Sequence, residues 1–102
     1  MDDGDQADQV RRRRLKFRAW HRGMREVDLL LGRFADASVD GMDEAGLADF
    51  EALLDMPDPQ VLAWVTGEET VPAERQTRFM RQFTQGEWYR YTFAGVWASR
   101  LF

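Results

Sequence analysis

Cysteine is absent from the 102 residues, and histidine occurs once, at His21. Without cysteine the chain has no disulfide, no thiolate nucleophile and no cysteine-based zinc site, and one histidine rules out a multi-histidine metal site. The two serines, Ser38 and Ser99, lie outside any nucleophile-elbow pattern, and no glycine-rich phosphate loop occurs. We therefore expect no catalytic residues, no metal site and no self-contained enzymatic activity.

Long apolar runs are also missing. No run approaches the ~18 residues that a membrane-spanning helix needs, and the first residues, MDDGDQAD, are too acidic and polar for a secretory signal. A length of 102 residues with 44% hydrophobic residues suits one domain with one modest core. We expect a soluble, intracellular protein that does not insert into membranes.

Basic side chains are missing from residues 36–74, which carry eleven acids, whereas residues 1–34 carry nine bases and six acids. Oppositely charged regions can steer and orient a partner. Four consecutive arginines at 11–14, with Lys16 and Arg18, allow an alternative function as a small helical nucleic-acid-binding module. Consecutive arginines point around a helix instead of lining one face, and the net charge is −4, so we expect no nucleic-acid partner.

The spacing of apolar residues predicts helices throughout the chain before position 87. The first is expected over about residues 7–22, with Gly23 as its C-cap. Its apolar stripe is expected to comprise Val10, Phe17, Trp20 and Met24. The second helix has the clearest 3.6-residue period, formed by Met24, Val27, Leu30, Leu31 and Phe34. Residues 35–41 are rich in turn formers and predict a turn.

Two further helices have recognisable ends. The third should begin after Asp43 as N-cap, bury Leu47, Phe50, Leu53 and Leu54, and end before the Met-Pro pair at 56–57. The fourth should begin with Asp58 as N-cap and Pro59 in its first turn, and end at residues 66–67.

The fifth helix is expected from Pro72 to about residue 85, with a glycine at 86 as its cap. Five short helices with short connections predict an all-α fold, a compact antiparallel bundle over residues 11–86. Residues 1–10 should form a flexible acidic tail. Residues 87–102 carry six aromatic side chains and form a C-terminal extension that either folds back on the bundle or covers a partner or a second copy.

The segment His21-Arg22-Gly23-Met24-Arg25-Glu26 lies between the first two predicted helices. Its glycine lets the backbone turn sharply and lets another surface approach closely. Arg22 could offer a bidentate guanidinium to a carboxylate or a backbone carbonyl. From the residues alone, a structural corner with a local Arg22–Glu26 ion pair and a docking site both remain possible.

Two motifs carry a resemblance to a known family. An Arg-Gly-Met-x-Glu-x-Asp stretch is followed, further along, by Asp-Pro-x-x-x-x-Trp; the residues are Arg22, Gly23, Met24, Glu26 and Asp28, then Asp58, Pro59 and Trp64. In this order and spacing, over roughly residues 11–85, the chain resembles the bacterial and mitochondrial flavin assembly factors of succinate dehydrogenase. It departs from them at His21, where many members have a second arginine, and in its longer, more aromatic tail.

The resemblance implies an assembly factor, or chaperone, that binds the flavoprotein subunit of succinate dehydrogenase or of fumarate reductase and promotes covalent attachment of FAD to a histidine of that subunit. The factor would hold the reacting groups in position and act on FAD carried by the partner, with no tightly bound cofactor of its own. The implied partner-binding residues are Arg22, Gly23, Met24, Arg25, Glu26 and Asp28. A monomer when free is expected, in the bacterial cytoplasm or the mitochondrial matrix.

Overall fold

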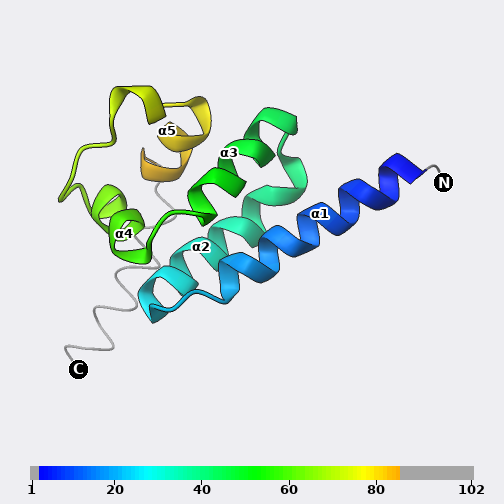
Figure 1. The fold of residues 1–102 in the computed structure, drawn as a ribbon, viewed down its shortest axis with the longest axis horizontal. Helices are drawn as coiled ribbons and strands as arrows, with labels where there is room; N and C mark the ends of the chain where they lie inside the picture. The colour runs from blue at the N-terminus through cyan, green and yellow to red at the C-terminus, as the bar shows by residue number, and fades with distance from the viewer. Residues whose placement is uncertain (1–2, 86–102) are drawn as a thin grey trace.

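The computed structural model describes residues 3–85, and its regular elements are all helical (Figure 1). They are α1 (Asp3–Trp20), α2 (Arg25–Ser38), the 3₁₀ helix η1 (Val39–Gly41), α3 (Glu44–Leu54), α4 (Asp58–Thr66), the 3₁₀ helix η2 (Ala73–Arg75) and α5 (Arg78–Gln85). Within residues 3–85 there is no strand, so the predicted all-α class is confirmed.

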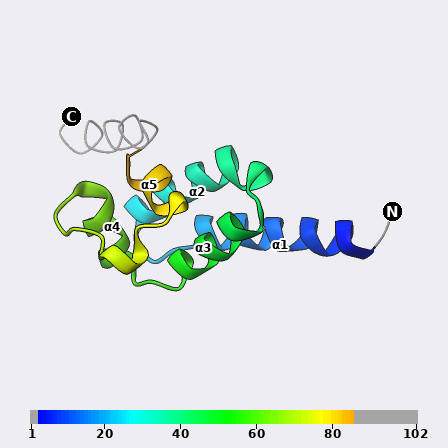
Figure 2. The same cartoon turned by 90° about the horizontal axis from the view of Figure 1, so that it is seen from above.

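Helices α1 and α2 form an antiparallel hairpin, and the first turns of α1 project beyond the rest of the bundle (Figure 1). Helix α3 packs against α1, while α4 and α5 lie together near the opposite end of the molecule (Figures 1 and 2). The corner that joins α1 to α2 therefore lies at the end of the molecule that also carries α4.

Four phenylalanines form the centre of the core. Phe34 of α2 lies 5.7 Å from Phe50 of α3 and 5.6 and 5.1 Å from Phe79 and Phe83 of α5, measured between ring centroids. Tilted and edge-to-face pairs at these separations are favourable. The second helix thus buries the predicted face, with Val27, Leu30, Leu31 and Phe34 at most 1% exposed.

The first helix differs from its prediction. It begins at Asp3, so most of the predicted tail is helical, and it ends at Trp20. Its buried residues are Leu15 and Ala19, whereas Phe17, expected in the apolar stripe, is 63% exposed. Leu15 and Ala19 lie two positions before and after Phe17, so burying their side of the helix turns Phe17 outward.

A glycine in the middle of α2 receives the indole ring of Trp20. A Cβ atom added to Gly32 would lie only 2.2 Å from Cδ2 of Trp20, so the indole ring lies against the α2 backbone and would have to shift to admit any other residue. The indole N–H of Trp20 donates to Asp36 at 3.2 Å. This contact fixes the end of α1 on α2, just before the corner.

Two predicted boundaries were wrong. Residues 35–41 are not a turn: α2 continues to Ser38 and η1 follows, because Ala35 and Val39 are fully buried and continue the apolar face. The fifth helix begins at Arg78 instead of Pro72, after η2. The hydroxyl of Thr77 accepts a hydrogen bond from the N–H of Met80 at 3.1 Å and so marks the actual helix start.

Two predicted caps are confirmed. The carboxylate of Asp43 accepts from the N–H of Gly46 at 2.8 Å and caps α3. Gly67 ends α4 with a φ of 80°, in the left-handed region that favours glycine. The predicted cap at residue 86 and the extension at 87–102 lie outside the described residues.

Candidate docking site

The corner between α1 and α2 is held by a carboxylate from a distant part of the sequence. Asp58, the first residue of α4, accepts a hydrogen bond from Nε of Arg22 at 2.7 Å. Its other oxygen accepts from the backbone N–H groups of Gly23 at 2.9 Å and Met24 at 3.0 Å. One side chain thus fixes three successive residues of the corner and joins the start of α4 to the start of α2.

The remaining nitrogens of Arg22 also bind inside the chain. Nη1 donates to the carbonyl of Leu54, the last residue of α3, at 2.5 Å, and Nη2 donates to that of Met56, in the connection from α3 to α4, at 2.6 Å. The side chains of Arg22 and Asp58 are only 12% and 13% exposed. The guanidinium thus makes the multiple contacts expected from sequence, but its acceptors belong to this chain, and its ion-pair partner is Asp58.

Two details of the predicted corner were therefore wrong. Gly23 is not a left-handed helix cap, because α1 ends at Trp20 and Gly67 is the one glycine of the described residues with positive φ. Asp58 does not cap its own helix: Pro57 holds the N-cap position of α4, and no side chain bonds there. The carboxylate instead accepts hydrogen bonds from the backbone N–H groups of Gly23 and Met24, which lie just before α2.

Asp28 completes the corner from within α2. Its carboxylate accepts a hydrogen bond from the backbone N–H of Arg22, and its own N–H donates to the carbonyl of Met24 at 2.9 Å. Both motif residues, Arg22 and Asp28, therefore hold the shape of the corner. Gly23 and Arg25 are exposed, Glu26 is half-buried, and the half-buried Met24 packs against the core.

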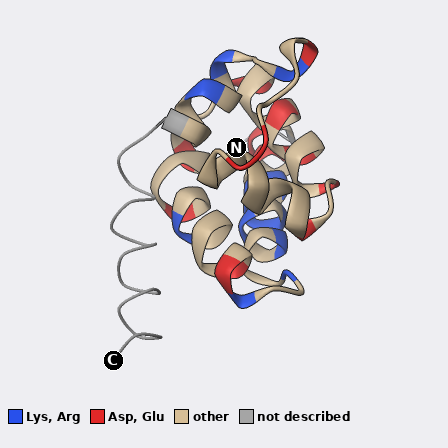
Figure 3. Ribbon diagram, turned by 90° about the vertical axis from the view of Figure 1, so that its left-hand side faces the viewer, with Lys and Arg blue, Asp and Glu red and all other residues tan. Residues whose placement is uncertain are grey.

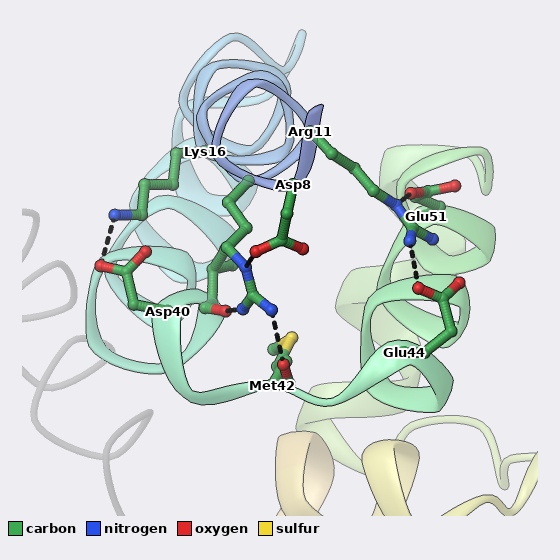
Figure 4. A network of polar contacts seen from close by, with 9 residues as sticks. Asp8, Arg11, Lys16, Asp40, Met42, Glu44 and Glu51 are labelled. Atoms are coloured by element: carbon green, nitrogen blue, oxygen red, sulfur yellow. Dashed lines mark hydrogen bonds and ion pairs between the residues drawn. The ribbon is translucent and has the colours of Figure 1, made fainter. Parts of the chain in front are cut away.

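The basic residues of α1 mostly contact the acidic half of the same chain (Figure 4). Arg11 pairs with Glu44 and Glu51, each at 2.5 Å. Lys16 pairs with Asp40 at 2.9 Å and Arg18 with Asp55 at 2.7 Å. Arg12 pairs with Asp8 at 2.7 Å and also donates to the carbonyls of Val39 and Met42.

These contacts explain the uneven charge of the sequence. The hydrogen bonds that Arg11 donates to Glu44 and Glu51 raise its pKa above its already high ordinary value, so this arginine stays charged. Basic and acidic segments lie beside each other on the ribbon instead of on separate faces (Figure 3). Much of the predicted nucleic-acid patch is therefore neutralised by the chain itself, which disfavours the alternative function.

No group of three or more histidine, cysteine, aspartate or glutamate side chains could hold a metal ion within the part of the chain that the structure describes. Across that same part, no helix has the length and apolar character to cross a membrane.

Sequence reasoning missed the partner of the corner. The sequence predicts Asp58 as the cap of its own helix because Asp-Pro at a helix start is a strong local signal. Local signals do not report contacts between distant residues, and Arg22 and Asp58 are 36 positions apart. The one available hint was that Asp58 belongs to the second of the two motifs. The structure shows that the two motifs form a single contact.

Comparison with known proteins supports the family resemblance that the two motifs indicate. A family model described as "Flavinator of succinate dehydrogenase" matches residues 13–86, which include both motifs. Over 76 residues the chain is 45% identical to "FAD assembly factor SdhE" of Acetobacter pasteurianus, covering 74% of this chain and 70% of the relative.

Mitochondrial relatives are similar over shorter stretches. The chain is 37% identical over 70 residues to "Succinate dehydrogenase assembly factor 2, mitochondrial" of Dictyostelium discoideum, covering 69% of this chain and half of that relative. A relative of the same name from Schizosaccharomyces pombe is 41% identical over 59 residues, 58% of this chain and 42% of its own length. With both motifs joined at one corner and the family match spanning most of the helical bundle, the chain belongs to the family of flavinators of succinate dehydrogenase.

Proposed function

We propose that this chain binds the flavoprotein subunit of succinate dehydrogenase, or of the related fumarate reductase, and promotes the covalent attachment of FAD to that subunit. The observation that carries the proposal is the corner itself. Asp58 and Arg22 lock it with two side chains that are almost buried, while Gly23 and Arg25 remain exposed beside them. A surface that is rigid before binding loses little conformational entropy on binding.

The motif residues then divide into two roles. Arg22 and Asp28 position the corner through hydrogen bonds within the chain. Gly23, Met24, Arg25 and Glu26 supply the surface that meets the partner: the glycine allows close backbone approach, Arg25 supplies an exposed cation, and Glu26 a half-buried anion. All six residues serve partner binding, although Arg22 and Asp28 act through the corner that they hold.

The flavinylation chemistry belongs to the partner and its FAD. The factor contributes by holding the flavin and the acceptor histidine of the partner in a reactive arrangement, and positioning alone can lower a barrier by several kcal/mol. This division fits a chain whose sequence holds one histidine and no cysteine. Relatives from a bacterium and from mitochondria support a bacterial cytoplasmic or mitochondrial matrix location.

The central test is Gly23→Arg. The position is exposed, and a Cβ atom there would meet only Asp58 Oδ2 at 3.4 Å, an ordinary contact, so the bundle should fold. We expect covalent flavin on the partner, read by in-gel fluorescence, to be lost while the melting temperature of the variant changes by only a few degrees. Glu26→Ala should weaken the complex and reduce flavinylation in the same assay.

Gly41→Arg is the matched control. Gly41 is also exposed and has nothing within 4 Å of an added Cβ atom, but it ends η1, which follows the C-terminal end of α2, whereas the corner precedes the N-terminal end of that helix. This variant should support normal flavinylation. Normal flavin fluorescence with Gly23→Arg, in a folded protein, would contradict the proposal.

A further inference from the structure

Phe17 is the one large hydrophobic side chain of the described residues that is strongly exposed, at 63%. Its ring stacks on the imidazole of His21, with centroids 3.9 Å apart and planes at 19°. Nδ1 of His21 also lies 2.6 Å from the carbonyl oxygen of Phe17. The exposed phenyl ring is therefore held in one orientation by the residue that directly precedes the Arg-Gly motif.

Cations without an acceptor lie along the same stretch. Arg11, Arg12, Lys16, Arg18 and Arg22 all contact acceptors inside the chain. By contrast, Arg13, Arg14 and Arg25 are exposed, and within residues 4–84 none of them makes an ion pair or hydrogen bond through its side chain. Their charge is available to another molecule.

Arg13 and Phe17 lie four residues apart on α1, and His21 follows after four more, so the three share one side of the helix and its end. We call Arg13, Phe17 and His21 the α1 ridge. The ridge leads directly into the corner, where Gly23 and Arg25 are exposed. Together with Arg25 of the corner, the ridge places an exposed arginine on either side of an apolar ring.

We propose that the α1 ridge is a second part of the docking surface and that the same flavoprotein subunit covers it with an apolar pocket bordered by carboxylates. This inference rests on the proposed function, because it assumes that the partner binds at the corner. Buried aromatic anchors next to arginine are typical of the residues that dominate binding energy, and acidic groups on the partner would complement Arg13 and Arg25.

The size of the ridge favours an occupant that already binds the adjacent corner over one, such as a second copy of the chain, that would bind the ridge alone. One aromatic side chain buries about 150–250 Å², whereas a stable protein complex buries about 1,200 Å² or more. The ridge is therefore too small to hold a partner alone and works as the continuation of a larger contact. The corner, next to it in the chain, provides that contact.

The experiment is a titration of the full chain against purified flavoprotein subunit, with the dissociation constant measured for Phe17→Ser, Arg13→Ser and Gly23→Arg. Phe17 and Arg13 are exposed, so both variants should fold, as thermal unfolding will show. We expect Phe17→Ser to weaken binding about tenfold or more, as loss of a buried aromatic anchor does. Arg13→Ser should weaken it about threefold, and less at high salt.

Arg78→Ser is the control for loss of a surface arginine, because Arg78 is exposed at the start of α5, whereas α1 packs mainly against α2, α3 and η1; this variant should bind like the unaltered protein. If Phe17→Ser binds normally while Gly23→Arg does not, the ridge is not part of the interface and the inference is overturned, although the proposed function stands. If both bind and flavinylate normally, the proposed function itself is wrong.

Discussion

Replacing Asp58 with alanine removes three contacts from the corner at once. The guanidinium of Arg22 loses its carboxylate, 2.7 Å away, and the N–H groups of Gly23 and Met24 lose the acceptor that they share. Arg22 cannot turn outward without also giving up its bonds to the carbonyls of Leu54 and Met56. The substitution therefore leaves a nearly buried cation without a counter-ion.

The size of the effect follows from burial. Removing one member of a buried ion pair costs about 3–5 kcal/mol, and because the two side chains retain 12% and 13% exposure, we expect about 3 kcal/mol. The backbone N–H group of the half-buried Met24 adds about 1 kcal/mol. A domain of this size loses about 4–8 °C in melting temperature per kcal/mol, so Asp58→Ala should melt about 16–32 °C lower.

Asp55→Ala is the matched control. Asp55 pairs with Arg18 at the same 2.7 Å, but the two side chains are 73% and 42% exposed, and exposed pairs contribute about 0–1 kcal/mol. Thermal and urea unfolding of both variants compares the two pairs directly. If Asp58→Ala melts no lower than Asp55→Ala, the pair with Arg22 does not hold the corner. Flavinylation should fall with Asp58→Ala even at temperatures where the variant is folded.

Three further substitutions test the packing and the charges. Gly32→Ala places a methyl group against the ring of Trp20 and should destabilise the fold by about 1–3 kcal/mol, seen as a lower melting temperature and altered tryptophan fluorescence. Gly41→Ala, with open space around it, should be nearly neutral. Equal effects of the two substitutions on stability would contradict the close contact between Gly32 and Trp20. Arg11→Ala breaks two partly exposed ion pairs and should lower the free energy of unfolding by at most about 1 kcal/mol. The difference in stability from the unaltered protein should shrink in 1 M salt. A difference that persists in 1 M salt would show that Arg11 stabilises the fold through packing instead. Thr77→Ala removes the cap of α5 and should cost about 1 kcal/mol in urea unfolding; no change would show that the helix end is held by other contacts.

Local patterns in the sequence were sufficient for much of the fold. The helical period of α2, the Asp43 cap and the Gly67 stop were all predicted and are present, because each depends on residues within about four positions of one another. The sequence patterns failed where packing against other helices determines which side chains are buried. Phe17 suits an apolar stripe, yet α1 buries Leu15 and Ala19 on its opposite side, which turns the phenyl ring to solvent.

The proposed docking segment shows the same division between local and tertiary information. Its position, its family motifs and its place between two helices could be read from the sequence. Tertiary structure decided how the corner is held and which of its residues remain exposed. Asp58 and Arg22 are 36 positions apart and meet only because α4 packs against α2. A contact over that separation leaves no periodic or local signature, so only the folded chain shows that the two motifs form one corner.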